Sequence, residues 1–142
     1  MVVHHAIDVK AAPDACWQRF VDLATWPEWF PLCKSARSLD GNPWRLGGRI
    51  EIRFQAGPMG VPIVVEVEEL EPGKVVRWRG GKLGLSGNHS YTFSVNSPGL
   101  TRVTSHEEFS GVTARWIPRK VIDRIDGEVH RSMERFKSLV ES

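Results

Sequence analysis

The chain has 142 residues, a formal net charge of +2, and 41% hydrophobic and 25% charged residues. This length suits a single domain, residues 1–142, which can bury about two-thirds of its unfolded surface without disulfides or metals. No apolar run approaches the roughly 20 residues that span a bilayer, which excludes stable membrane insertion. The basic residues are interleaved with acids, whereas nucleic-acid-binding proteins usually carry a clustered basic stripe, so we expect no nucleic-acid partner.

Residues 2–9 alternate with a period of two, which predicts a strand. Pro13 then suits the first turn of a helix, and apolar residues follow it at helical spacing. A second short helical turn is predicted over residues 25–30, with Thr25 in the N-cap position and Pro31 closing it. The first part of the chain is therefore predicted to be one strand followed by two short helices.

From residue 33 onward the period of two returns. Glu71–Lys74 is a tight turn between antiparallel strands, and Gly80–Leu85 is predicted to be a glycine-rich loop. Such short links favour an antiparallel meander. The predicted strands cover residues 33–40, 49–55, 61–70, 75–80, 87–95 and 101–110.

Cys16 and Cys33 are the only cysteines, and their spacing is not that of a metal site. We expect both to be reduced core residues of a cytoplasmic protein. The start of the sequence has no basic segment followed by an apolar one, so no signal peptide is expected.

Residues 115–142 predict one long amphipathic helix, with Pro118 in the opening turn, where its missing N–H costs nothing. The apolar stripe recurs at steps of three, four and seven, and consists of Ile117, Val121, Ile122, Ile125, Val129, Met133, Phe136 and Val140. The opposite face carries charges, among them Arg124 and Glu128. A basic group at the start of the helix is interpreted as a solvated face, and it contains Arg115, Arg119, Lys120 and Arg124. A helix with one apolar side of this length needs the sheet as its partner.

Polar side chains share the inward faces of the last two predicted strands with large apolar ones. Alternation places His89 and Tyr91 with Phe93, and Glu107 with Phe109. A buried carboxylate is costly when unpaired. One interpretation of Glu107 is therefore a salt bridge or hydrogen bond to a neighbouring-strand arginine or to His89. The other is a polar anchor or general base inside a cavity.

The same two interpretations apply to the neighbours of Glu107. His89 could donate a hydrogen bond to a ligand carbonyl or shuttle a proton, or it could be a satisfied core histidine. Tyr91 could polarise a carbonyl, or it could pack in the core. We keep Glu107, His89 and Tyr91 as candidate catalytic residues.

Three groups of segments resemble those of a known superfamily. The first is residues 7–13 (IDVKAAP) with Trp17, and the second is Asp22 through Pro31, which ends in WPEWFP. The third comprises residues 76–80 (VRWRG), His89, residues 99–104 (GLTRVT) and residues 107–111 (EEFSG). Over the whole chain they resemble the START-like superfamily, also called the helix-grip or birch-pollen-allergen fold. The polyketide cyclase/dehydrase and lipid-transport-like branch is the most similar.

This resemblance implies an α+β, helix-grip fold. A curved antiparallel seven-stranded sheet would wrap around a long C-terminal helix, with two short helices between strands 1 and 2. It also implies an apolar cavity between sheet and helix, with its mouth near the second short helix and the strand-connecting loops. The six tryptophans could frame a packed core or line that cavity. Because this superfamily hosts carriers, cyclases, hydrolases and chaperone-associated modules, the fold alone leaves the activity open.

The sequence contains no nucleophile elbow, phosphate-binding loop or HExxH zinc motif, so we expect no metal and no cofactor. His4 and His5 are adjacent on a strand and point to opposite faces, so they do not share an ion. Met59, between glycines in a loop, is either a flexible gate or a loop anchor. The expected ligand-binding residues are Trp29, Phe30, Phe54, Met59, Trp78, His89, Tyr91, Phe93, Glu107, Phe109, Ile122, Ile125 and Val129.

Three functional hypotheses are compatible with these observations. The first is a protein that binds a hydrophobic or aromatic small molecule, lipid- or polyketide-like, between the sheet and the C-terminal helix. The second is a cyclase/dehydrase-type enzyme with Glu107 or His89 as general base. The third is a protein-interaction module, ranked last because no long exposed apolar strip is visible in the sequence. No particular oligomeric state is predicted.

Overall fold

The computed structural model describes all of residues 1–142. The predicted order of one strand, two short helices, six strands and one long helix is confirmed. The strands are β1 (Val2–Val9), β2 (Cys33–Ser38), β3 (Arg49–Phe54), β4 (Val61–Glu71), β5 (Val75–Lys82), β6 (Leu85–Ser97) and β7 (Leu100–Ser110). The helices are α1 (Pro13–Phe20), α2 (Trp26–Trp29) and α3 (Arg119–Glu141), with 3-10 turns η1 (Leu23–Thr25) and η2 (Ala114–Trp116).

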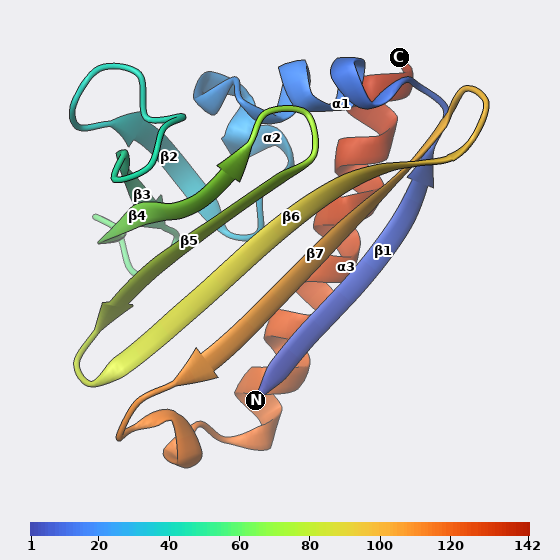
Figure 1. The fold of residues 1–142 in the computed structure, drawn as a ribbon. Helices are drawn as coiled ribbons and strands as arrows, with labels where there is room; N and C mark the ends of the chain where they lie inside the picture. The colour runs from blue at the N-terminus through green and yellow to red at the C-terminus, as the bar shows by residue number, and fades with distance from the viewer.

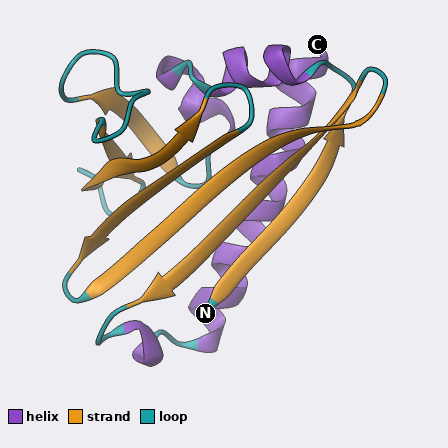
Figure 2. Ribbon diagram, in the orientation of Figure 1, coloured by secondary structure: helices purple, strands orange, loops and turns teal.

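All strands belong to one antiparallel seven-stranded sheet in the order β1-β7-β6-β5-β4-β3-β2. The sheet curves around α3, which runs alongside β1 (Figure 1). The helices α1 and α2 lie across one end of the sheet, next to the C-terminus of α3. The N-terminus, the β5–β6 turn and η2 lie at the opposite end (Figure 2). None of the helices combines the length and apolar character needed to cross a bilayer.

An aromatic core fills the end that α1 and α2 close. Phe20, which is fully buried, lies at its centre. The ring centroid of Phe20 is 4.9 Å from that of Tyr91 and 5.6 Å from that of Trp29. Further ring contacts of Phe20 and its neighbours bring in Trp17, Trp26, Trp44, Trp78, Phe93 and Phe136. Most of the tryptophans therefore frame a packed core, which leaves room for a ligand only toward the other end.

The two halves of α3 differ in burial. Its buried residues are Val129, near the middle of the helix, and Ser132, Met133 and Phe136 in the C-terminal half. Phe136 packs edge-on against Trp29, with ring centroids 4.9 Å apart. Upstream, Val121 is 43% exposed although it belongs to the predicted apolar stripe. The C-terminal half of α3 is thus anchored in the core, and the N-terminal half stands over less densely filled space.

The predicted start of the last helix is wrong. Ala114–Trp116 form the separate turn η2, and α3 begins at Arg119. Ile117 and Pro118 between them are extended, with ψ of 121° and 143°. A residue that precedes proline is disfavoured in the helical region, so Ile117 cannot continue a helix from Arg115. Pro118 accordingly occupies the N-cap position instead of the first turn.

The predicted glycine-rich loop over Gly80–Leu85 is also wrong. The strands β5 and β6 extend into it and leave only Leu83 and Gly84 as a two-residue turn. Both have positive φ, 55° and 78°, as a type I′ hairpin turn requires. Thr25 occupies the N-cap position of α2 as predicted, but its side chain makes no cap hydrogen bond and instead donates to the carbonyl oxygen of Asp22.

Candidate functional site

A pocket of about 430 Å³ lies between the sheet and the N-terminal half of α3. Its wall comes from four parts of the fold: the segment after α2, the β3–β4 hairpin, the concave faces of β6 and β7, and one side of α3. The wall consists of Phe30, Pro31, Leu32, Phe54, Gln55, Ala56, Ile63, His89, Glu107, Phe109, Val121, Arg124, Ile125, Glu128 and Val129.

A smaller pocket of about 150 Å³ reaches toward β5. Phe30, Phe54, Ile63, His89, Glu107 and Phe109 line both pockets. The smaller pocket adds Trp78, which is 3% exposed and therefore belongs to the sheet side of the core. Because the two pockets share this wall, they form two parts of one mainly apolar recess with one polar spot that is common to both.

His89 and Glu107 make that polar spot. They are directly opposite each other on β6 and β7, so the sheet register brings them together. His89 Nδ1 lies 2.7 Å from Glu107 Oε2, which is an ion pair when the imidazole is protonated. His89 Nε2 shares a hydrogen bond of 2.8 Å with Ser105 Oγ. The imidazole is thus held at both nitrogens by side chains of β7.

Burial separates the roles that these three side chains can take. Ser105 is fully buried and His89 is 4% exposed, whereas the side chain of Glu107 retains 20% exposure. A molecule in the pocket would meet the Glu107 carboxylate first and the edge of His89 second. Ser105 orients the imidazole without reaching the pocket. The group can accept a hydrogen bond or a proton from a ligand.

Two charged residues of α3 complete the pocket wall and were not predicted from the sequence. Arg124 and Glu128 were assigned to the solvated face, but both line the pocket. Glu128 forms an ion pair with Arg131, and Arg124 has no ion-pair partner. Their spacing relative to Val121 and Ile125 could have predicted this, since residues three and four apart share one side of a helix.

The structure brings most of the expected ligand-binding residues to the pocket wall: Phe30, Phe54, Trp78, His89, Glu107, Phe109, Ile125 and Val129. Trp29, Tyr91 and Phe93 are instead part of the aromatic core around Phe20. For Tyr91 and Phe93, alternation predicts the face of β6 correctly but does not say how far along the strand the core extends. Trp29 lies in α2, which packs its aromatic side chains into this core.

The other two expected residues lie elsewhere. Met59 is 77% exposed in the β3–β4 loop and touches neither part of the pocket. The backbone carbonyl of Met59 accepts a hydrogen bond from Arg53, so the loop is held by its backbone and the side chain is left in solvent. Ile122 faces a different depression near the β7–α3 connection, because a step of one residue on a helix turns its side chain by about 100°.

Tyr91 is shielded from the pocket. It is 1% exposed, its ring stacks on His89 at 4.5 Å, and its hydroxyl has no hydrogen-bond partner in the protein. Burial raises the pKa of this phenol far above its ordinary value. As a candidate catalytic residue Tyr91 therefore lacks contact with the pocket, and its ring acts as packing behind His89.

The cysteines are buried and free. Burial raises the pKa of Cys33 to about 11 and also raises that of Cys16. Neither residue lines the pocket. Because the thiolate is the reactive form, both side chains behave as small core residues and not as nucleophiles. No group of three or more His, Cys, Asp or Glu side chains has a metal-binding arrangement.

Comparisons with known proteins agree with this architecture. Residues 1–141 match the model of the family described as polyketide cyclase / dehydrase and lipid transport. No curated protein matches the sequence. A Helicobacter pylori hypothetical protein is similar in structure, with a TM-score of 0.80, 18% identity, and coverage of 99% of this chain and 88% of the other.

Two further solved structures are similar over most of this chain. A START superfamily protein from Mycobacterium smegmatis has a TM-score of 0.75 and 14% identity, with coverage of 99% of this chain and 97% of the other. The di-domain ARO/CYC protein BexL of the BE-7585A biosynthetic pathway has a TM-score of 0.70 and 18% identity, with coverage of 93% of this chain and 45% of the other. At these identities the likeness establishes the START-like, helix-grip fold.

Proposed function

We propose that this chain, which belongs to the polyketide cyclase / dehydrase and lipid transport family, binds a hydrophobic or aromatic small molecule in the pocket beneath α3. The observation that carries the proposal is a mainly apolar recess with the Glu107–His89 pair on its sheet side and Arg124 and Glu128 on its α3 side. Small-molecule sites commonly combine a mostly apolar wall with a few polar groups that fix orientation.

The pocket dimensions narrow the class of ligand. A volume of about 430 Å³ is near the small end of the range of roughly 300–1,000 Å³ that ligand pockets occupy. This favours a compact aromatic or single-chain molecule over a lipid with two long chains. Burial of its apolar surface would contribute about 25 cal/mol per Å² before the costs of association. The rings of Phe30, Phe54 and Phe109 form much of the apolar wall against which that ligand surface would be buried.

The charged groups predict the orientation of the ligand. The Glu107 carboxylate accepts hydrogen bonds, so a ligand hydroxyl or phenol would point toward β7. Arg124 at the α3 side has no ion-pair partner and suits a carboxylate or enolate on the ligand. A lipid- or polyketide-like molecule with an apolar body, a hydroxyl and an acidic group would match all three features of the pocket.

A second candidate function is a cyclase or dehydrase reaction, and the carboxylate on the pocket wall favours it. A bound chain with a methylene group between carbonyls would give a proton from that carbon to Glu107, and the resulting enolate would then attack or eliminate within the folded chain. His89, held by Ser105, would stabilise the charge on Glu107. Carrier and enzyme thus differ in whether the molecule bound at this site reacts.

The first experiment is native mass spectrometry of the freshly purified protein, which should detect a co-purified lipophilic molecule. The ligand so identified is then titrated against an Ile125→Trp variant, whose indole would occupy the pocket. We expect at least a tenfold loss of affinity. Ser138→Trp places the same side chain at a position of α3 outside the pocket and serves as the control. Equal affinity for the two variants and the wild type would remove the pocket from the proposal.

The Glu107→Gln variant separates carrier from enzyme. Glutamine keeps the shape and can still accept a hydrogen bond but is not a base. If the protein is an enzyme, turnover should disappear while ligand affinity changes little. Turnover that persists in this variant would rule out Glu107 as the base, and a ligand that leaves chemically unchanged from both proteins would support the carrier function.

A further inference from the structure

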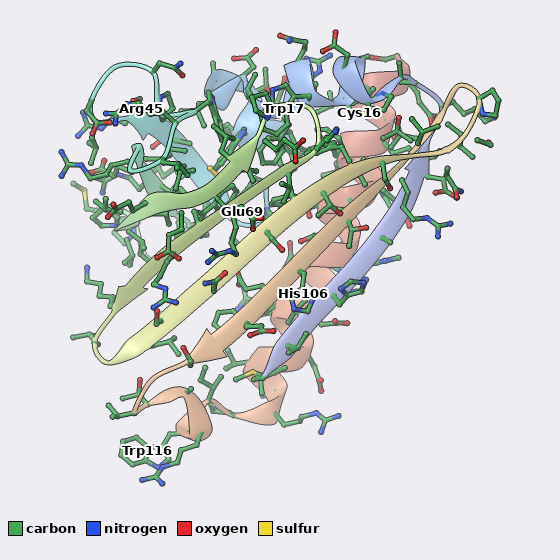
Figure 3. The ribbon with its side chains drawn as sticks, viewed as in Figure 1. Cys16, Trp17, Arg45, Glu69, His106 and Trp116 are labelled. Carbon is green, nitrogen blue, oxygen red and sulfur yellow. The ribbon has the colours of Figure 1, made fainter.

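One end of the molecule carries exposed apolar side chains that the fold does not use. Leu83 in the β5–β6 turn is 87% exposed, and Val112 and Trp116 in the β7–α3 connection are 75% and 67% exposed. We call these three residues the apolar tip. Trp116 points away from the sheet at the end opposite to α1 (Figure 3).

The two segments of the apolar tip are fastened to each other. The Thr113 hydroxyl donates a hydrogen bond of 3.3 Å to the Leu83 carbonyl, and the Thr113 N–H donates one of 3.4 Å to the Gly84 carbonyl. The β5–β6 turn and the β7–α3 connection therefore present their apolar residues as one protrusion. Next to it lies an open depression lined by Val112, Ala114, Ile117 and Ile122, which continues the apolar surface toward α3.

Leu83 occupies a position that folding alone does not favour for leucine. Its φ is 55°, in the left-handed region where asparagine, aspartate and glycine are preferred in such a turn. Its side chain gains almost nothing from burial in the protein, since it is 87% exposed. A strained, solvent-exposed leucine at the point of a protrusion indicates a contact outside the chain.

The surroundings of the apolar tip are basic. Residues 80–87 and 109–125 contain five basic side chains and one acidic side chain, although the whole chain has 19 basic and 17 acidic residues. The one acid, Asp123, is 3.4 Å from Arg119 and is thus already paired. Arg115 lies over the Trp116 ring, with its guanidinium carbon 5.2 Å from the ring centroid. Lys82 and Lys120 have no ion-pair partner.

We propose that the apolar tip docks peripherally on a bilayer surface that contains anionic phospholipids. Tryptophan is enriched at the interface between headgroups and acyl chains, and leucine and valine gain from shallow burial there. Basic residues beside them are attracted to anionic headgroups. A convex apolar protrusion with a basic surround fits a deformable lipid surface, whereas a protein partner would need a matching groove.

This inference does not rest on the proposed function, because Leu83, Val112 and Trp116 lie outside the pocket, although Lys82 and Arg124 of the basic surround also line it. Its connection to the pocket is positional. Val121 and Arg124, which follow η2 on the first turns of α3, line the pocket wall. Docking of the apolar tip would therefore place the N-terminal half of α3, the less buried half, next to the bilayer.

The test is co-sedimentation of the full chain with phosphatidylcholine vesicles that contain about one-third phosphatidylglycerol, compared with pure phosphatidylcholine. We expect binding to the anionic vesicles that weakens in high salt. Trp116 is the only tryptophan that is largely exposed. When the protein binds vesicles, the fluorescence emission of Trp116 should shift to the blue, and acrylamide should quench it less.

Variants assign the contact. Leu83→Asn and Trp116→Ser should each weaken binding at least fivefold, whereas Val95→Asn removes an exposed valine at the other end of β6 and should change nothing. Lys120→Gln should weaken binding about fivefold, as expected for one basic residue near an anionic surface. Arg135→Gln, on the far half of the same helix, is its control.

Three results would overturn the proposal. They are no sedimentation with anionic vesicles, equal binding by the Leu83→Asn and wild-type proteins, and a concentration-dependent dimer that Leu83→Asn dissolves. The last result would assign the tip to a second protein chain. Leu83→Asn relieves the backbone conformation, so a loss of binding cannot be attributed to unfolding. Titration of the pocket with its ligand in the absence of vesicles tests the proposed function by itself. A failure of membrane docking is thereby distinguished from a failure of ligand binding.

Discussion

His89 Nδ1 lies 2.7 Å from Glu107 Oε2, and the two residues face each other directly across the β6–β7 ladder. The backbone of two neighbouring strands therefore fixes their separation. This pair is the only polar group of the sheet in the wall of the larger part of the pocket, and Ser105 behind it is fully buried. The pair links the stability of the protein to the chemistry that the pocket can perform.

The first prediction concerns the stability that this pair contributes. Glu107→Gln should lower the free energy of unfolding by less than about 1 kcal/mol, because the amide oxygen can still face His89. Glu107→Leu should lower it by about 1–3 kcal/mol, since Nδ1 of a buried imidazole then has no partner. Urea unfolding measures both values. If both variants unfold at the same urea concentration as the wild type, the ion pair has no role in stability.

The second prediction tests the two halves of α3. Phe136 is 1% exposed and packs on Trp29, so Phe136→Ala should cost about 3–5 kcal/mol. Ile125 lines the pocket and is only partly buried, so Ile125→Ala should cost about 1 kcal/mol. Urea unfolding of both variants provides the comparison. Similar losses would mean that α3 is uniformly anchored and that the space beneath its first half is not a weak point.

The sequence predicted the fold because its patterns are local. Alternation over residues 101–110 placed Glu107 and Phe109 on the concave face, and the pairing of His89 with Glu107 was among the alternatives considered. The register is set by the short hairpin that pairs Ser97 with Leu100, together with a one-residue shift between Val95 and Ser97 that brings His89 opposite Glu107. The polar spot of the pocket was therefore accessible to reasoning from the sequence.

The features that the sequence could not predict depend on distance along an element. Tyr91 and His89 share a face of β6, yet one lies in the aromatic core and the other on the pocket wall. That boundary is set by where α1 and α2 lie across the sheet, which no strand pattern contains. Likewise Arg124 was assigned to solvent, because only the tilt of α3 over the sheet decides which flank of its stripe faces the pocket.

The third prediction is a loss of stability at alkaline pH that originates at Cys33. Burial raises the pKa of Cys33 from the ordinary 9.0 to about 11. Between these values the unfolded chain has released the thiol proton and the folded protein still holds it. Stability should therefore fall as the pH rises from 9 to 11, by an amount on the order of 2 kcal/mol.

Urea unfolding at several pH values checks this, with Cys33→Ala as the comparison. The variant should be less stable at neutral pH, but its stability should fall less steeply between pH 9 and 11. Cys16, whose pKa is also raised by burial, keeps part of the effect in the variant. Identical alkaline slopes for both proteins would contradict the assignment to Cys33.

The fourth prediction concerns the stability of the protein in acid and the Asp8–Arg102 ion pair between β1 and β7. Arg102 Nε and Nη2 donate hydrogen bonds of 2.9 Å and 3.2 Å to the Asp8 carboxylate, and these bonds hold the pKa of Asp8 below its ordinary 3.8. The folded state thus favours the charged form. This contribution is present at neutral pH and is lost as the pH falls below about 4 through the lower pKa of the folded protein.

Asp8→Asn should accordingly be slightly less stable than the wild type at about pH 6, and the difference should shrink toward about pH 2. Arg102→Gln should behave in the same way, and the double variant should lose no more than either single one at about pH 6. Thermal unfolding across this pH range provides the measurement. A constant difference at every pH would show that Asp8 acts through packing and not through its charge.

The fifth prediction uses the β5–β6 turn to separate the needs of the fold from those of the surface. Leu83 has a φ of 55°, so Leu83→Asn should raise the free energy of unfolding by about 0.5–1 kcal/mol. Gly84 has a φ of 78°, and a Cβ there would lie 3.0 Å from Val112 Cγ2, so Gly84→Ala should lower it by about 1 kcal/mol or more. Urea unfolding of the two variants measures both. A destabilised Leu83→Asn protein would mean that the leucine serves the fold itself, and the argument that its exposure serves an external contact would lose its support.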